Sequence, residues 1–107
     1  DDRVSRGLGD VYKRQAIFGL GDQIGYSEYF VDGIGILAEV ILANGGRIIG
    51  HWPTDGYTFS ESKALVDKDH FYGLAIDEDN EDEMTFDRVR QWVEQVSSEV
   101  KELFSKY

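Results

Sequence analysis

The chain has 107 residues, enough for one small domain, and it contains no cysteine, which excludes disulfides, zinc–thiolate sites and iron–sulfur clusters. A hydrophobic content of 41% and an aromatic content of 13% are typical of a globular protein. The net charge is −10, and residues 16–107 alone carry −11. A body this acidic repels nucleic acid and anionic membranes, so we expect it to be steered toward basic partners. The absence of cysteine fits a cytoplasmic protein. The alternative is that the charge serves solubility only.

The first half of the chain predicts a strand, a glycine-rich loop and a helix. Residues 1–15 show no regular period, whereas the apolar run over residues 16–18 predicts the end of a buried strand that Val11 and Tyr12 could begin. A loop with three glycines follows over residues 19–26. A helix is expected to begin near Ser27, because serine can cap free N–H groups, and to end at Asn44-Gly45-Gly46. Its predicted apolar face consists of Phe30, Ile34, Leu37, Ala38 and Ile41.

The second half predicts two further strands and a second helix. Residues 47–52 form the first strand, which Pro53 ends, and a polar stretch follows from residue 54 to residue 70. Residues 71–76 form the next strand, and an acidic loop follows over residues 77–83. The final helix is expected to begin near Thr85. Its predicted apolar face consists of Phe86, Val89, Val93, Val96, Val100 and Leu103.

Alternation of strands and helices indicates an α/β fold with a parallel sheet. In such sheets ligands bind beyond the carboxyl ends of the strands. The glycine-rich loop at residues 19–26 follows the first predicted strand directly. We therefore expect it to hold a ligand.

The residues of this loop and of four later segments resemble the C-terminal half of a long-chain flavodoxin. The segments are Phe18-Gly19-Leu20-Gly21-Asp22-Gln23-Ile24-Gly25-Tyr26 with Glu28-Tyr29-Phe30, Gly50-His51-Trp52-Pro53-Thr54, Asp55-Gly56-Tyr57, Ser62-Lys63-Ala64-Leu65, and Gly73-Leu74-Ala75-Ile76-Asp77-Glu78-Asp79-Asn80. The resemblance implies a partial flavodoxin-like parallel sheet over residues 16–107, made of the last two strands and the last two helices. The final strand would be split by a long loop, with Trp52 ending its first part and Phe71 or Tyr72 opening its second.

The resemblance implies that the bound cofactor is FMN and that the protein is a low-potential electron carrier, not an enzyme. Tyr26 would stack on the flavin ring, and Asp22 with neighbouring backbone groups would hydrogen-bond its pyrimidine edge. The implied contact residues are Gly19, Leu20, Gly21, Asp22, Gln23, Gly25, Tyr26 and Tyr29. The implied partners are basic redox proteins such as a flavodoxin/ferredoxin reductase. The chemistry agrees, because a flat apolar cofactor needs an aromatic face and a few polar edge groups.

The sequence before Ala16 contains no phosphate-binding motif of the family. We therefore expect these 107 residues alone to bind FMN weakly or not at all. Residues 1–15 resemble nothing in the family, and residues 5–15 look like a translated sequencing adapter, so we hypothesise that this segment is an assembly artefact.

Other readings stay open at this point. An acidic interaction module without a cofactor would bind partners whether or not Tyr26 is present. Tyr26 could also be an aromatic that packs on the core at the helix entry. A metal pair of His51 and His70 lacks zinc-type spacing. The acidic run from Asp77 fails the calcium-loop pattern, because its sixth position is Asp82 rather than glycine.

Overall fold

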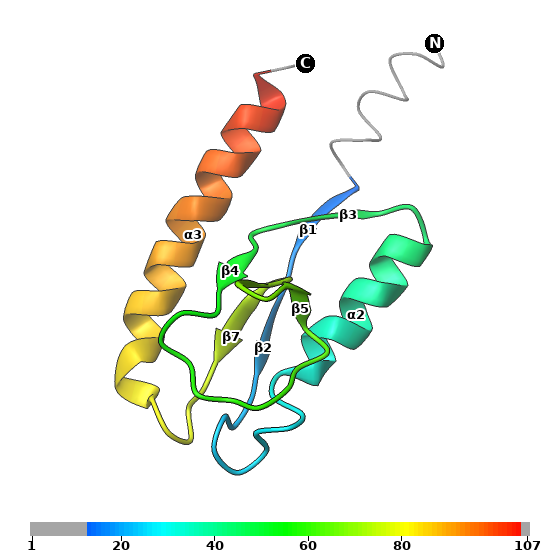
Figure 1. Cartoon of the computed structure of the whole chain (residues 1–107). Coiled ribbons are helices and arrows are strands. Elements are labelled where there is room, and N and C mark those ends of the chain that lie inside the picture. Colours follow the sequence, from blue (N-terminus) through cyan, green and yellow to red (C-terminus); the bar gives the residue numbers. More distant parts are fainter. Residues whose placement is uncertain (1–12, 106–107) are drawn as a thin grey trace.

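The computed structural model describes residues 13–105 and shows a small parallel sheet between two helices, α2 and α3 (Figure 1). Strand β1 (Arg14–Ala16) pairs in parallel with β3 (Arg47–Ile49), and β2 (Phe18–Leu20) pairs in parallel with β7 (Leu74–Ile76). Only Ile17 separates β1 from β2, and its carbonyl accepts a hydrogen bond from the Leu74 N–H at 3.0 Å. The continuous extended segment from Arg14 to Leu20 therefore pairs first with β3 and then with β7. This confirms the partial flavodoxin-like parallel sheet.

The first strands extend further than predicted at both ends. Arg14 and Gln15 belong to β1, although the sequence placed them in an unrelated segment, while Val11 and Tyr12 lie outside the described residues. The second strand continues through Gly19 to Leu20 rather than ending before a loop. A Cβ added at Gly19 would lie 2.7 Å from Cγ1 of Ile34. Glycine therefore lets helix α2 approach the strand closely.

The polar stretch after the third strand contains a small antiparallel sheet that the sequence did not predict. Its strand order is β4 (Trp52–Pro53), β6 (His70–Phe71), β5 (Leu65–Asp67). Trp52 and Phe71 pair with each other in this sheet, so the prediction that they bound the two halves of the final parallel strand was wrong. Gly50 has a φ of 77°, a left-handed conformation that turns the chain out of β3.

Helix α2 (Asp32–Ala43) begins later than the predicted Ser27. The Ser27 hydroxyl lies 3.0 Å from that of Ser60 instead of capping the helix, and Val31 enters the helix with a left-handed φ of 46°. Phe30 is buried but precedes the helix, and Leu37, predicted to be in the core, is 46% exposed. The predicted end is confirmed by Asn44 as C-cap and Gly45 with a φ of 82°. Ile34, Ala38 and Ile41 are buried as predicted.

Helix α3 (Asp82–Phe104) begins before the predicted Thr85, and its predicted apolar face is partly wrong. Phe86 is 77% exposed and Val93 is 51% exposed. The side facing the sheet instead carries Trp92 and Gln95, which donate to the carbonyls of Gly50 and His51, each at 2.7 Å. These carbonyls lie where the chain leaves β3. The helix therefore donates hydrogen bonds to backbone carbonyls that have left the strand. The apolar period of the helix cannot predict these polar contacts.

An aromatic cluster forms the core where the long loop meets the sheet. Phe30 and Phe71 are fully buried with ring centroids 5.8 Å apart, and Tyr57 and Phe59 pack on both. The Tyr57 hydroxyl donates to the Ala75 carbonyl at 2.5 Å. The long loop is therefore an integral part of the core. Within the described residues, neither helix combines the length and the apolar character that crossing a membrane requires.

Candidate functional site

Two loops meet at the carboxyl ends of β2 and β7, at the lower end of Figure 1. Residues 21–31 connect β2 to α2, and residues 77–81 connect β7 to α3. The Gly21 N–H donates to the Ile76 carbonyl at 2.9 Å, which extends the pairing of the two strands into the loops. We define residues 21–31 as the glycine loop and residues 77–81 as the acidic loop.

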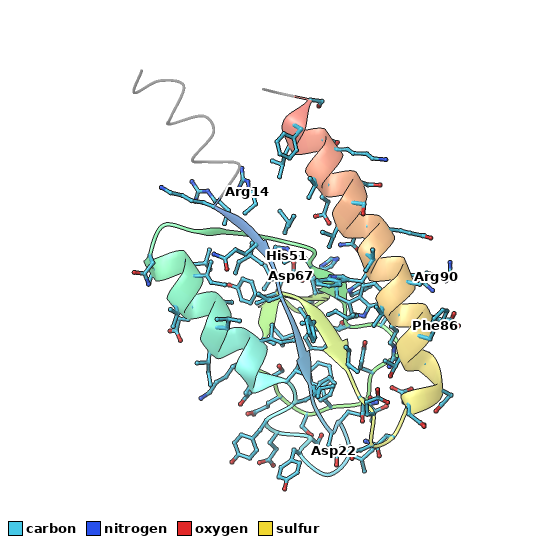
Figure 2. All side chains as sticks on the ribbon, turned by 180° about the vertical axis from the view of Figure 1, so that it is seen from behind. Arg14, Asp22, His51, Asp67, Phe86 and Arg90 are labelled. Carbon is cyan, nitrogen blue, oxygen red and sulfur yellow. The ribbon has the colours of Figure 1, made fainter. Side chains whose placement is uncertain are left out.

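Asp22 organises the glycine loop. Its Oδ1 accepts hydrogen bonds from the N–H groups of Ile24 at 3.0 Å and Gly25 at 2.6 Å, and from Nδ2 of Asn80 at 2.8 Å. The hydrogen bond from Gly25 is the main cause that lowers the pKa of Asp22, and the bond from Asn80 lowers it further. The Asp22 side chain lies at the lower end of the molecule in Figure 2. It therefore fixes the loop as an anion at neutral pH.

Gln23 points inward and joins three segments. It is 4% exposed, and its N–H donates to Oδ2 of Asp77 at 3.1 Å. Its side chain donates to Oε1 of Glu81 and accepts from the Thr58 N–H, each at 2.5 Å. Gln23 therefore connects the glycine loop to the acidic loop and to the long loop, and it lies beneath the surface that a ligand would touch.

Asp77 is the fully buried charge of the site. Burial alone would raise the pKa of Asp77, but hydrogen bonds from Asn80 and from the Gln23 N–H outweigh burial and keep this pKa below its usual value. Nδ2 of Asn80 lies 2.9 Å from Oδ2 of Asp77 and also donates to Asp22. The amide of Asn80 therefore links the two carboxylates.

Exposed apolar and aromatic side chains surround a shallow hollow of about 290 Å³ beside the glycine loop. Tyr26, Tyr29 and Leu20 are 67%, 65% and 69% exposed. Five of the eight predicted contact residues line this hollow: Leu20, Gly21, Asp22, Tyr26 and Tyr29. Gly25 lines a second hollow on the other side of Tyr26, whereas Gly19 lies under α2 and Gln23 is buried.

The sequence analysis did not identify the long-loop residues that hydrogen-bond the glycine loop. The Ser60 N–H donates to the Ser27 carbonyl at 2.9 Å and to the Ser27 hydroxyl at 2.8 Å. No sequence signal indicates this contact between two loops. Asp77 and Asn80 could have been found, because they follow a strand that neighbours β2 in a parallel sheet.

The loop end of the molecule is strongly negative. Residues 21–33 and 77–83 carry nine carboxylates and neither lysine nor arginine. A larger hollow of about 600 Å³ lies between α3 and the long loop, lined by Trp52, Asp55 and Arg88 among others, and contains none of the predicted contact residues. Within residues 13–105, no cluster of three or more His, Asp or Glu side chains could hold a metal ion.

The chain is similar in sequence to known proteins, and each match covers about half of the relative's length. The chain is 54% identical over 88 residues to Flavodoxin 1 of Salmonella typhimurium, covering 82% of this chain and 50% of that protein. It is 54% identical over 87 residues to flavodoxin of Nostoc sp., covering 81% of this chain and 51% of that protein. The chain thus spans about half the length of the curated relatives it matches. No family model matches it.

The fold is similar to that of a solved flavin-binding protein. The crystal structure of Fusobacterium nucleatum flavodoxin bound to flavin mononucleotide superposes with a TM-score of 0.75 at 28% sequence identity, covering 92% of this chain and 62% of that one. The K13G mutant of the same protein, also bound to flavin mononucleotide, gives the same TM-score of 0.75.

Proposed function

We propose that this chain is part of a flavodoxin and that its glycine loop forms one wall of an FMN site in an electron carrier. The observation that carries the proposal is the pair of exposed tyrosines, Tyr26 and Tyr29, beside a hollow at the carboxyl ends of parallel strands. Large aromatic side chains are seldom left in solvent around a hollow without a ligand to cover them. We infer that residues 16–107, together with Arg14 and Gln15 of β1, form the flavodoxin unit and that it is of the long-chain type.

The residues of the loop fit the ring system of a flavin. Tyr26 and Tyr29 offer aromatic faces. Oδ2 of Asp22 offers a polar group at the edge, since the hydrogen bonds that Asp22 accepts within residues 13–105 go to Oδ1. Leu20 and the backbone of Gly21 complete the hollow. When bound, FMN supplies the capacity to take up and release electrons.

The described residues do not fit the phosphate of FMN. Helix N-termini are the usual anion sites, because their free N–H groups and dipole favour negative charge. Here α2 begins with Asp32, and α3 begins with Asp82 and Glu83 after Glu81. These carboxylates would repel a phosphate at either helix. The chain alone is therefore expected to hold the ring and not the phosphate.

The proposed role of these residues is to bind the flavin ring, to shield one of its faces from water and to lower its reduction potential. The tyrosines exclude water from one face of the ring, and the Asp22–Asn80–Asp77 network keeps the loop in one conformation. Negative charge on Asp22 and in the acidic loop disfavours added electrons on the flavin, which lowers its reduction potential. The same charge would orient basic redox partners, such as a flavodoxin/ferredoxin reductase, toward the flavin end.

Titration of the purified chain with FMN and with riboflavin tests this proposal. We expect micromolar or weaker binding with similar affinity for both ligands, because neither helix N-terminus among residues 13–105 favours a phosphate. Tyr26→Ala should weaken both by about tenfold, since an aromatic pair contributes roughly 0.5–1.5 kcal/mol beyond the area it buries. Phe104→Ala, which removes a 52% exposed ring at the far end of α3, is the matched control.

Two results would overturn the proposal. Nanomolar FMN binding with a strong preference over riboflavin would show that the chain holds the phosphate. Binding of neither flavin, together with partner binding that is insensitive to Tyr26→Ala, would favour an acidic interaction module without a cofactor.

A further inference from the structure

A hollow of about 600 Å³ lies between one face of α3 and residues 52–56, where the long loop begins (Figure 1). Its α3 side carries Met84, Asp87, Arg88 and Gln91, which lie three or four residues apart and therefore share one face of the helix. Among the described residues, those that line the hollow include none of the proposed flavin site. The hollow is therefore available to a different ligand.

Arg88 lines the hollow with a guanidinium group that is fixed in place and incompletely hydrogen-bonded. The residue is 6% exposed, and its Cζ lies 4.2 Å from the centroid of the Tyr57 ring. Nη2 donates to Oε1 of Glu81 at 3.2 Å, whereas Nη1 is buried and has no hydrogen-bond partner among residues 13–105. A buried donor without a partner is costly, so an oxygen atom supplied by a ligand would complete the hydrogen bonding of Arg88.

Negative charge surrounds the same hollow. Three exposed carboxylates line it, those of Asp55, Glu83 and Asp87. Arg88 is the only lysine or arginine among the described residues of the lining, and its ion pair already offsets its charge. Asp87 also lies 3.8 Å from Arg90, but exposed ion pairs of this kind contribute little energy. The hollow therefore combines one buried donor with a rim that attracts a cation.

We propose that this hollow binds a peptide segment that carries a lysine or arginine side chain. A backbone carbonyl of the segment accepts a hydrogen bond from Nη1 of Arg88, and the basic head group meets the three carboxylates. The aliphatic stem packs on Trp52, Pro53 and Met84, which supply the apolar part of the lining. Long basic side chains bind in this way, with the stem on apolar surface and the charge in water.

Other ligand classes satisfy only one of the two features. A simple amine offers no acceptor to Nη1, and a carboxylate ligand meets three like charges at the rim. Since Nη1 is buried in the unliganded chain, entry of the segment requires a rotamer change of exposed lining side chains such as Met84 or Gln91. Changes of this kind are common when partners bind. The inference does not depend on flavin binding, because the two sites share no residue.

Titration of the ¹⁵N-labelled chain with the peptide acetyl-Gly-Lys-Gly-amide tests the inference by NMR. We expect saturable shifts of the Trp52 indole N–H and of the Gln91 side-chain amide. Replacing the lysine of the peptide by norleucine removes only the ammonium group and should weaken binding up to about fivefold. Butylamine keeps the ammonium group but has no carbonyl acceptor, and it should also bind more weakly than the lysine peptide.

Variants of the chain test the two features separately. Arg88→Lys keeps a positive charge opposite Glu81 but removes the second amino group, and Asp87→Asn removes one carboxylate of the rim. Each should weaken binding of the lysine peptide about two- to fivefold. Asp55→Asn, at an exposed position, repeats the second test if Arg88→Lys fails to fold. Glu102→Gln is the matched control, because Glu102 is an exposed carboxylate of α3 that does not line the hollow.

Four results would overturn the proposal. Absence of saturable shifts with the lysine peptide would show that water alone satisfies Nη1. Equal binding of the norleucine peptide would indicate an unselective apolar hollow, and equal binding of butylamine would indicate attraction of any cation to the rim. Equal weakening by Glu102→Gln and Asp87→Asn would indicate that net charge, not the hollow, governs binding.

Discussion

At the scale of single residues, Asp77 determines whether the two loops of the site stay together. It is fully buried, and it accepts hydrogen bonds from the Gln23 N–H and from Asn80. The hydrogen bonds lower its pKa in the folded protein despite burial. A lowered folded pKa means that the ionised carboxylate contributes stability above the unfolded pKa of about 3.9, and that this stability is lost as the pH falls through the folded pKa.

Replacing Asp77 by asparagine should therefore destabilise the chain at pH 7 and make its stability less sensitive to acid. Leaving charge-assisted hydrogen bonds unmade costs about 1–3 kcal/mol. Urea unfolding at pH 7 and at pH 3 measures both effects, and the difference between the variant and the original chain should shrink at pH 3. Asp79→Asn is the matched control, because Asp79 is an exposed carboxylate of the same loop. Equal losses in both variants would contradict a special role for Asp77.

The positions of Tyr26 and Asp22 on the loop that follows a parallel strand could be predicted from the sequence, because glycines after a strand in an α/β pattern indicate such a loop. The inward orientation of Gln23 did not. Its burial depends on Thr58 and Glu81, 35 and 58 residues away in the chain, which no local pattern reveals. The long-range hydrogen bonds of the site, as opposed to its exposed residues, are what the sequence could not predict.

At the scale of elements, the docking of α2 onto the long loop depends on one glycine. A Cβ at Gly35 would meet the carbonyl group of Lys63, which is backbone and cannot rotate away. Gly35→Ala should therefore destabilise the chain by about 1–3 kcal/mol through overpacking. Thermal or urea unfolding measures the loss.

The same helix provides a control for helix propensity. A Cβ at Gly33 would meet nothing within 4 Å. Gly33→Ala should raise stability by up to about 1 kcal/mol, because alanine loses less backbone entropy in a helix. If both substitutions stabilise the chain, α2 and the long loop are not in the close contact described here.

The alternation of helices and parallel strands was predictable, but several boundaries were not. Phe30 fits the helical period and is buried, yet the left-handed Val31 starts the helix two residues later. The apolar period of α3 suggested a buried face, whereas Phe86 and Val93 of that period are exposed and Trp92 faces the sheet. A periodic stripe shows which side of a helix avoids water and does not show whether this chain or another one covers it.

At the scale of the whole molecule, negative charge is concentrated at the loop end of the parallel sheet. The nine carboxylates of residues 21–33 and 77–83 surround the candidate flavin loop without a lysine or arginine among them. A one-sign field of this kind accelerates encounter with an oppositely charged protein by 10-fold to about 1,000-fold at low salt. If the protein is an electron carrier as proposed, the acidic end would select basic redox partners by rate more than by affinity.

If the glycine loop binds FMN as proposed, electron exchange between a basic c-type cytochrome and an FMN-loaded fusion of residues 16–107 to the unmatched half of the Salmonella relative should be sensitive to salt. Its second-order rate constant, followed by stopped-flow absorbance, should fall about tenfold as ionic strength rises from about 0.01 M to about 0.15 M, because the Debye length shortens from about 30 Å to about 8 Å. The double variant Glu78→Gln/Asp79→Asn should lower the rate constant severalfold at low salt. It should leave electron transfer to a small neutral quinone unchanged, since no steering field acts on an uncharged oxidant.

Removing two charges from elsewhere distinguishes local charge from net charge. Glu94→Gln/Glu102→Gln changes two exposed carboxylates of α3 outside the acidic loop and alters the net charge equally. If this variant slows the cytochrome reaction as much as Glu78→Gln/Asp79→Asn does, net charge governs the encounter. If only the loop variant slows it, the partner docks at the end of the sheet where Tyr26 is exposed, and the field of the loops directs electron exchange to that end.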